Sequence, residues 1–236
     1  MRVLLRQRMA WAVMVLLAIN ASNASAHFVW IQTEGGEGQL VVRSGFGEPE
    51  GWDPELADRM KSAKFWTRFA GGLQPLVVPY DAKQEEYRTS VAGSAPSAVI
   101  GSCDFGVVQL GSRPASWLRY TAKSLVGEPS TWAEDKPTND LRIELLAKLD
   151  GNRVQLKALH LGQPLADLTI KAQTPKGDNV ELKTDTQGVA YWPLAEAGVY
   201  GCYVGKTTKE PGESGGKKYE ALMDYTTLTF AIAKSP

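Results

Sequence analysis

Short apolar segments separated by turn residues are the feature of this 236-residue chain that most restricts its fold. From Arg153 to Ala158, polar Arg, Gln and Lys alternate with apolar Val, Leu and Ala. Successive side chains of a strand point to opposite faces, so this alternation predicts a strand with one buried face. Turn residues follow at Gly162-Gln163-Pro164, Pro175-Lys176-Gly177-Asp178 and Asp185-Thr186-Gln187-Gly188. Strands at such short, regular spacing favour an all-β fold with a β-sandwich in the second half.

The first half carries the same pattern together with one helix start. From Ser116 to Val126, Trp, Arg, Thr and Lys alternate with Leu, Tyr, Ala and Ser, which is strand periodicity. Asp53-Pro54-Glu55 combines a capping residue, a proline at the first helical position and an acid. We therefore predict a short helix from about Pro54 to Ala63. The segment from Gly127 to Asn139 is rich in proline and polar residues, and we expect it to be a loop or the connection between the two halves.

These patterns divide the chain into three predicted parts. Residues 1–26 form a signal peptide, residues 27–139 a β-rich N-terminal domain with one short helix, and residues 140–236 a C-terminal β-sandwich. Within the last part, the stretch from Lys206 to Lys218 is full of Gly, Lys, Glu and Ser. This composition predicts a mobile surface loop.

The first 26 residues have the three parts of a secretory signal. Arg2, Arg6 and Arg8 give a basic start, Met9 to Ile19 is an apolar run, and Ala24-Ser25-Ala26 is a small-residue cleavage site. The apolar run is too short to span a bilayer, which takes roughly 20 residues, and no second long run follows. We expect a mature protein without a membrane span, located in the periplasm or at the cell surface.

The charge balance argues against nucleic acid as a partner. The chain has 26 basic and 26 acidic residues, and three of the basic ones are the arginines of the predicted signal. The mature part is therefore slightly acidic, whereas nucleic-acid binding takes clustered positive charge. No basic amphipathic stretch indicates binding to a membrane surface either.

The two cysteines, Cys103 and Cys202, leave two interpretations open. In an oxidising compartment the pair is compatible with one disulfide, and the alternative is two buried free thiols. The count excludes a cysteine-rich metal site.

Two sets of motifs resemble known families. Gly162-Gln163-Pro164-Leu165-Ala166, Asp185-Thr186-Gln187-Gly188 and Ala197-Gly198-Val199-Tyr200 resemble an immunoglobulin-like or transthyretin-like module of exported bacterial proteins, which implies an Ig-like C-terminal sandwich. The whole mature chain is similar to the exported DUF4198 family, some members of which are linked to nickel or cobalt uptake. That similarity rests on His27-Phe28-Val29-Trp30, Phe46-Gly47-Glu48, Asp104-Phe105-Gly106-Val107, Tyr120-Thr121-Ala122-Lys123, the second-half motifs and Thr226-Thr227-Leu228-Thr229-Phe230.

His27 is the first candidate for a metal ligand. Cleavage after Ala26 would leave His27 with a free α-amine, so one residue would offer two neutral nitrogens, and copper and nickel favour such donors. The alternative is that a histidine merely happens to follow the cleavage site. Copper monooxygenases and copper-resistance proteins with a histidine brace add a second imidazole, for which this chain has only His160. His160 follows the inward parity of Val154, Leu156 and Ala158, so it also suits a hydrogen-bonded residue near a strand end.

Oxygen and sulfur donors could complete such a site. Asp104, Glu48 and Asp224 lie at predicted loops or strand ends, and the favoured explanation of each is a turn cap or a surface ion pair. Met223 offers a thioether suited to Cu(I), although methionine usually serves packing. The predicted metal ligands are accordingly His27, His160 and Asp104.

Three functions follow from these residues. The first is a non-enzymatic exported protein that binds nickel or copper for uptake or handling, with a membrane transporter as its partner. The second is a structural or adhesive surface module with a protein or glycan partner and no metal. The third is a copper monooxygenase that uses both histidines. No nucleophile elbow, His-Glu-x-x-His motif, phosphate loop or dinucleotide fingerprint occurs, so we predict no enzyme and no catalytic residue.

Overall fold

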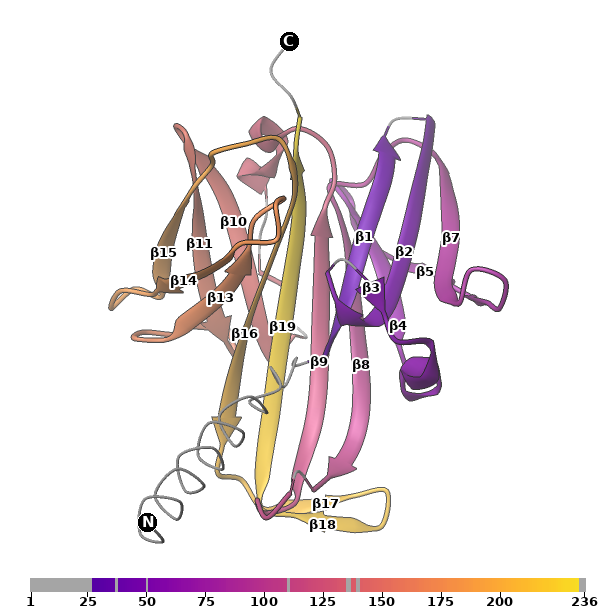
Figure 1. The fold of residues 1–236 in the computed structure, drawn as a ribbon, viewed down its shortest axis with the longest axis vertical. Coiled ribbons are helices and arrows are strands. Elements are labelled where there is room, and N and C mark those ends of the chain that lie inside the picture. Colours follow the sequence, from indigo (N-terminus) through magenta and orange to yellow (C-terminus); the bar gives the residue numbers. More distant parts are fainter. Residues whose placement is uncertain are drawn as a thin grey trace, which may run out of the picture.

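The computed structural model describes residues 27–36, 38–49, 51–109, 111–134, 137–138 and 141–233. Strands make up most of this part of the chain, and the predicted all-β fold is confirmed (Figure 1). The predicted signal peptide, residues 1–26, lies outside the described residues. Within them, no helix has the length and apolar character needed to cross a bilayer.

One long sheet runs through the molecule and joins its two halves. In the described residues it has eight strands, in the order β14-β13-β16-β19-β9-β8-β4-β5. The last strand of the chain, β19, pairs in parallel with β9 from the first half, from Ala221 opposite Ser116 to Thr229 opposite Ser124. The other pairs of this sheet are antiparallel. The strands are β4 (Lys64–Phe69), β5 (Gly72–Leu76), β8 (Ala98–Val108), β9 (Ser116–Leu125), β13 (Thr169–Gln173), β14 (Asn179–Lys183), β16 (Gly198–Thr208) and β19 (Ala221–Ile232).

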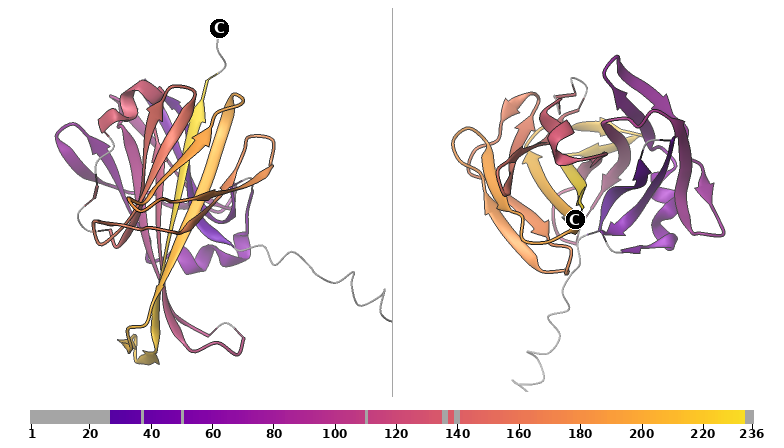
Figure 2. Two further views of the ribbon diagram at one scale, coloured as in Figure 1. Left: turned by 90° about the vertical axis from the view of Figure 1, so that its left-hand side faces the viewer. Right: turned by 90° about the horizontal axis from the view of Figure 1, so that it is seen from above.

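Two smaller sheets cover opposite faces of the long sheet. One contains β1 (Phe28–Gly36), β2 (Gly38–Glu48), β3 (Gly51–Trp52), β6 (Tyr80–Asp81) and β7 (Glu86–Gly93). The other contains β10 (Ile143–Asp150), β11 (Arg153–His160), β12 (Gln163–Pro164) and β15 (Val189–Pro193). Strand β1 packs on β8, β9 and β19, and β10 packs on the other face of β19 and β16. Seen from above, the two covering sheets form separate lobes on either side of the shared sheet (Figure 2).

Each lobe has its own apolar core. The core under β10 and β11 is built around Trp192, Tyr200 and Phe230, whose rings stack or meet edge to face 5.0–5.7 Å apart. The core under β1 and β2 contains Trp30 and Ile31, both almost fully buried. Burial of these aromatic and aliphatic side chains is the main stabilising term of both sandwiches.

Threonine hydroxyls on β19 donate hydrogen bonds to backbone carbonyls at the outer edge of β1. In the part of the chain that the structure describes, this strand ends its sheet and pairs only with β2, so alternate carbonyls of β1 have no strand partner there. Thr227 Oγ1 donates to the Val29 carbonyl at 2.7 Å, and Thr229 Oγ1 donates to the Ile31 carbonyl at 2.5 Å. Both hydroxyls are buried. The covering sheet is thereby joined to the central sheet by hydrogen bonds as well as by apolar packing.

The predicted helix is confirmed, although it is shorter than expected. It is a 3₁₀-helix, η1 (Pro54–Met60), and the Asp53 carboxylate accepts from the Glu55 N–H at 3.0 Å. A second 3₁₀-helix, η2 (Pro129–Glu134), occupies the predicted connection between the halves.

The prediction of a loop from Lys206 to Lys218 is wrong. Strand β16 continues to Thr208, and β17 (Gly212–Ser214) and β18 (Lys217–Tyr219) form a hairpin. Gly215 and Gly216 supply the two positive φ angles of its turn, which only glycine adopts without strain. The abundance of glycine therefore marked a tight turn.

Cys103 and Cys202 are both free and buried, so the structure contradicts a disulfide between them. Cys103 belongs to the core under β1, and Cys202 belongs to the core under β10. Burial raises the pKa of the Cys103 thiol to about 11 and raises the pKa of the Cys202 thiol further. Both thiols are therefore held in the unreactive protonated form.

We expect neither thiol of the folded protein to react with an aromatic disulfide reagent at pH 8, and both to react in 6 M guanidinium chloride. Burial blocks access, and the raised pKa of each thiol suppresses the thiolate. The number of thiols titrated before and after unfolding measures both effects. If neither thiol reacted even after unfolding, this would show that Cys103 and Cys202 form a disulfide.

Candidate functional site

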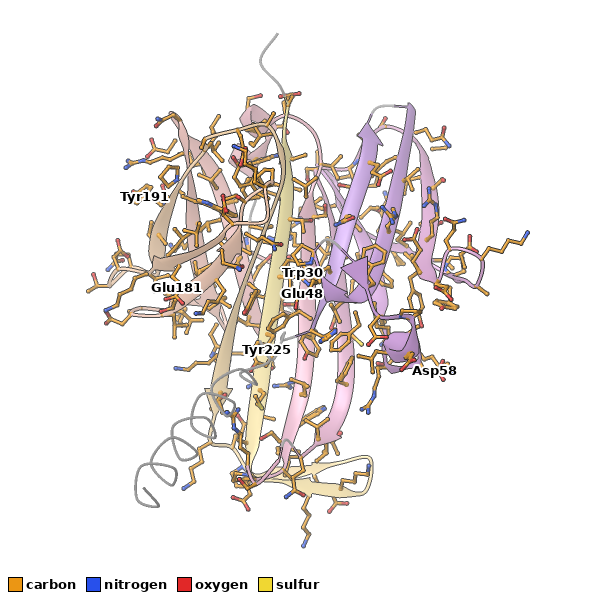
Figure 3. The ribbon with its side chains drawn as sticks, in the orientation of Figure 1. Trp30, Glu48, Asp58, Glu181, Tyr191 and Tyr225 are labelled. Atoms are coloured by element: carbon orange, nitrogen blue, oxygen red, sulfur yellow. The ribbon has the colours of Figure 1, made fainter. Side chains whose placement is uncertain are left out.

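A half-open cavity of about 610 Å³ lies against the face of the central sheet that β1 covers. It is bordered by the start of β1, by η1, by the ends of β8 and β9, by β19 and by the β17–β18 hairpin. In Figure 3, Tyr225, which lines the cavity, is labelled on β19, and Asp58 is labelled on η1. The lining residues are His27, Phe28, Phe46, Leu56, Arg59, Phe105, Val107, Val108, Gln109, Leu118, Tyr120, Lys217, Met223 and Tyr225.

Helix η1 is fixed to β8 by contacts at its C-terminal end. Ser62 Oγ donates to the Asp104 carbonyl at 2.8 Å, and the Cys103 thiol donates to the Arg59 carbonyl at 3.5 Å. Met60 is buried beneath the helix. These contacts place Leu56 and Arg59 at the cavity.

A β-bulge on β8 presents Phe105 to the cavity. The register with β9 shifts between Asp104 and Gly106, which leaves Phe105 without an opposite partner. Gly106 has a φ of 80°, and its N–H donates to the Asp104 carboxylate at 2.8 Å. A glycine in the left-handed region is the usual requirement of such a bulge, and a bulge commonly redirects a side chain.

The walls of the cavity are mainly aromatic. The ring centroids of Phe46 and Phe105 are 4.5 Å apart, and each lies 5.1–5.5 Å from Tyr120 in an edge-to-face arrangement. Tyr120 stacks on Tyr225 at 5.7 Å, and Phe28 lies 5.3 Å from Tyr225. Burial raises the pKa of both tyrosines, so both phenols remain neutral. The interior of the cavity therefore presents aromatic faces and neutral hydroxyl groups.

His27 lies at this cavity. Its imidazole stacks on Phe46 with a centroid distance of 6.0 Å and an interplanar angle of 24°, and the Tyr120 hydroxyl donates to its carbonyl at 3.5 Å. Met223, a second predicted donor, lines the same cavity. Signal cleavage would create a free α-amine on His27 itself. The amine, the His27 imidazole and the Met223 thioether would then lie in one region.

His160 lies on the opposite face of the central sheet from His27. Its Nε2 is 3.4 Å from the Asp224 carboxylate, which also pairs with Arg119 at 2.7 Å and Arg142 at 3.2 Å. Asp224 and Met223 are neighbours on β19, so their side chains point to opposite faces. The structure therefore does not bring the two histidines together, and a histidine brace between them is not formed.

Asp104 is likewise directed away from His27. Its carboxylate accepts a hydrogen bond from the Trp117 indole N–H at 2.6 Å. The Arg119 Cζ atom lies 4.6 Å from the centroid of the Trp117 ring. The role of Asp104 as a turn cap for Gly106 matches the alternative stated from sequence. Among the described residues, no three His, Cys, Asp or Glu side chains are grouped as a metal site requires.

Sequence reasoning missed most of the cavity. Arg59, Lys217 and Tyr225 were not candidates, because their distance along the chain gives no sign that they meet. A signal was present in the family-like motifs, since Phe28, Phe46, Phe105 and Tyr120 each come from a different one.

Comparisons with known proteins give only distant likenesses. No protein-family model matches the chain, and no curated protein matches it. Among solved structures, one concerned with host cell surface retention of a 1.5-MDa bacterial ice-binding adhesin is 11% identical, with a TM-score of 0.24 and 86% of this chain covered. A marsupial T cell receptor is 10% identical, with the same TM-score and the same coverage. The chain spans 65% and 63% of the lengths of these two structures, and likeness at this level supports no inference about function.

Proposed function

We propose that this chain is an exported, non-enzymatic binding protein whose ligand site is the aromatic cavity, and that mature His27 binds nickel or copper there for uptake or handling. The observation that carries the proposal is the convergence at one cavity of His27, Phe46, Phe105 and Tyr120, each from a separate family-like motif. Export and processing after Ala26 are part of the proposal and rest on the pattern of residues 1–26.

The donor set of His27 fits a borderline transition metal. An α-amine and an imidazole of one residue form a compact chelate, and copper and nickel stand at the strong end of the affinity order for nitrogen ligands. The Met223 thioether would add a soft donor that favours Cu(I). Two nitrogens leave coordination positions for water or a co-ligand, which suits a protein that passes its metal on to a transporter.

We expect the processed protein to bind Cu²⁺ or Ni²⁺ with a sub-micromolar Kd, measured by calorimetric titration. An extra residue before His27 should weaken metal binding at least about 100-fold, because it removes the free α-amine from the chelate. The variant His27→Ala should weaken binding by the same factor, because it removes the imidazole. His160→Ala is the matched control, since His160 contacts Asp224 on the other face, and it should leave the metal Kd unchanged.

Two outcomes would contradict this proposal. Equally weak binding by the processed and the extended protein would remove His27 as a ligand and favour the surface-binding module without metal. Equal losses in His27→Ala and His160→Ala would favour the two-histidine copper site despite the separation of the residues across the sheet. Mass spectrometry of the mature N-terminus checks cleavage after Ala26 in the same sample.

A further inference from the structure

Among the described residues, the formal charges at the cavity are all positive. The lining residues that the structure describes include Arg59 and Lys217 but no Asp or Glu. Both cationic side chains are exposed, and the Arg59 guanidinium lies 5.7 Å from the centroid of the Phe105 ring. These two cationic side chains attract an anion to the cavity.

The interior requires an apolar ligand body. Aromatic rings and the aliphatic side chains of Leu118, Val107 and Met223 form most of the wall. Its volume of about 610 Å³ is within the range of roughly 300–1,000 Å³ for small-molecule sites. An apolar body would displace water from these faces, while its anionic group stayed at the cationic residues.

We propose that the cavity binds a small monocarboxylic acid with an aromatic or medium-length aliphatic body. The carboxylate pairs with Arg59 and Lys217, and the body packs against Phe46, Phe105 and Tyr225. This inference rests on the cavity being the ligand site of the proposed function, but it requires no metal. A carboxylate held beside His27 would also be available as a co-ligand for a metal bound there.

The test compares 4-phenylbutyrate with its neutral isostere 4-phenylbutanamide, in metal-free buffer, by calorimetry and ligand-observed NMR. We expect the acid to bind at least about tenfold more tightly, because only its carboxylate gains charge-assisted hydrogen bonds. The double variant Arg59→Gln/Lys217→Gln should abolish this preference and leave amide binding unchanged. Phe105→Ala should weaken both ligands, which places the body in the cavity.

The matched control is Lys61→Gln/Lys218→Gln, which removes two exposed cations that lie two positions and one position after the tested ones in sequence but outside the lining. It should keep the preference for the acid. Equal binding of acid and amide, a preference that persists in Arg59→Gln/Lys217→Gln, or no binding of either ligand would overturn the proposal. Because the buffer is metal-free and His27 is unchanged, failure of this test leaves the metal titration unaffected, and the reverse also holds.

Discussion

Replacing Glu144 with leucine should lower the free energy of unfolding by about 3–5 kcal/mol, because it removes one partner of a buried ion pair. Glu144 Oε1 lies 2.6 Å from Lys123 Nζ and 4.0 Å from Arg68 Nη2, and the carboxylate also accepts from the Thr138 N–H at 2.8 Å. The side chains of Lys123 and Glu144 are 2% and 4% exposed. Urea denaturation followed by circular dichroism measures the loss.

The relative losses of stability in single and double variants test this arrangement. Lys123→Met should cost less than Glu144→Leu, because Glu144 keeps Arg68 and the Thr138 N–H when Lys123 is lost. The double variant should recover part of the loss, since it removes both charges of the buried pair. Asp150→Leu, on the same strand but in an exposed pair with Arg153, should cost less than about 1 kcal/mol. A larger loss in Lys123→Met than in Glu144→Leu would contradict the arrangement.

The double variant Thr227→Val/Thr229→Val should cost about 2–6 kcal/mol, because it orphans two buried carbonyls of β1. Each lost hydrogen bond leaves an unsatisfied acceptor, worth about 1–3 kcal/mol. Valine keeps the approximate volume, so the loss reports the hydroxyls more than a cavity. Thermal and urea unfolding measure it, and hydrogen exchange should show faster opening of β1 than of β10.

Thr169→Val on β13 serves as the control, because Thr169 is exposed and should change stability by less than about 0.5 kcal/mol. An effect of the double variant no larger than this control would show that water, or a shift of β1, replaces the two hydroxyls.

Local patterns predicted the strands and the helix start well. The alternation from Arg153 to Ala158 marks β11, where Val154, Leu156 and Ala158 are fully buried. The cap at Asp53 and the proline after it predicted η1. Both signals are local, because side-chain parity and capping depend on only a few neighbouring residues.

Long-range features had no local signal. Periodicity predicts that β9 is a strand but does not reveal that its partner is β19. Because β9 is covered on both faces, its polar residues Thr121, Lys123 and Ser124 are buried, although alternation suggested one solvated face. The separation of His27 from His160 likewise depends on which face of the shared sheet each one meets. The cavity could be predicted only as separate motifs, since its walls come from both halves.

The parallel pairing of β9 with β19 has a consequence for the order in which the molecule assembles. The Thr121 hydroxyl lies 3.4 Å from the Tyr225 carbonyl, although the two residues are 104 positions apart. A chain that is synthesised from its N-terminus acquires β8 and β9 long before β19, so one edge of β9 stays unpaired while the segment between Leu125 and Ala221 is made. Contacts of such sequence separation slow folding, because the entropy of closing the long intervening segment is lost before the pairing stabilises it. The first lobe is therefore completed only when the last strand arrives, and both halves should reach their final state together.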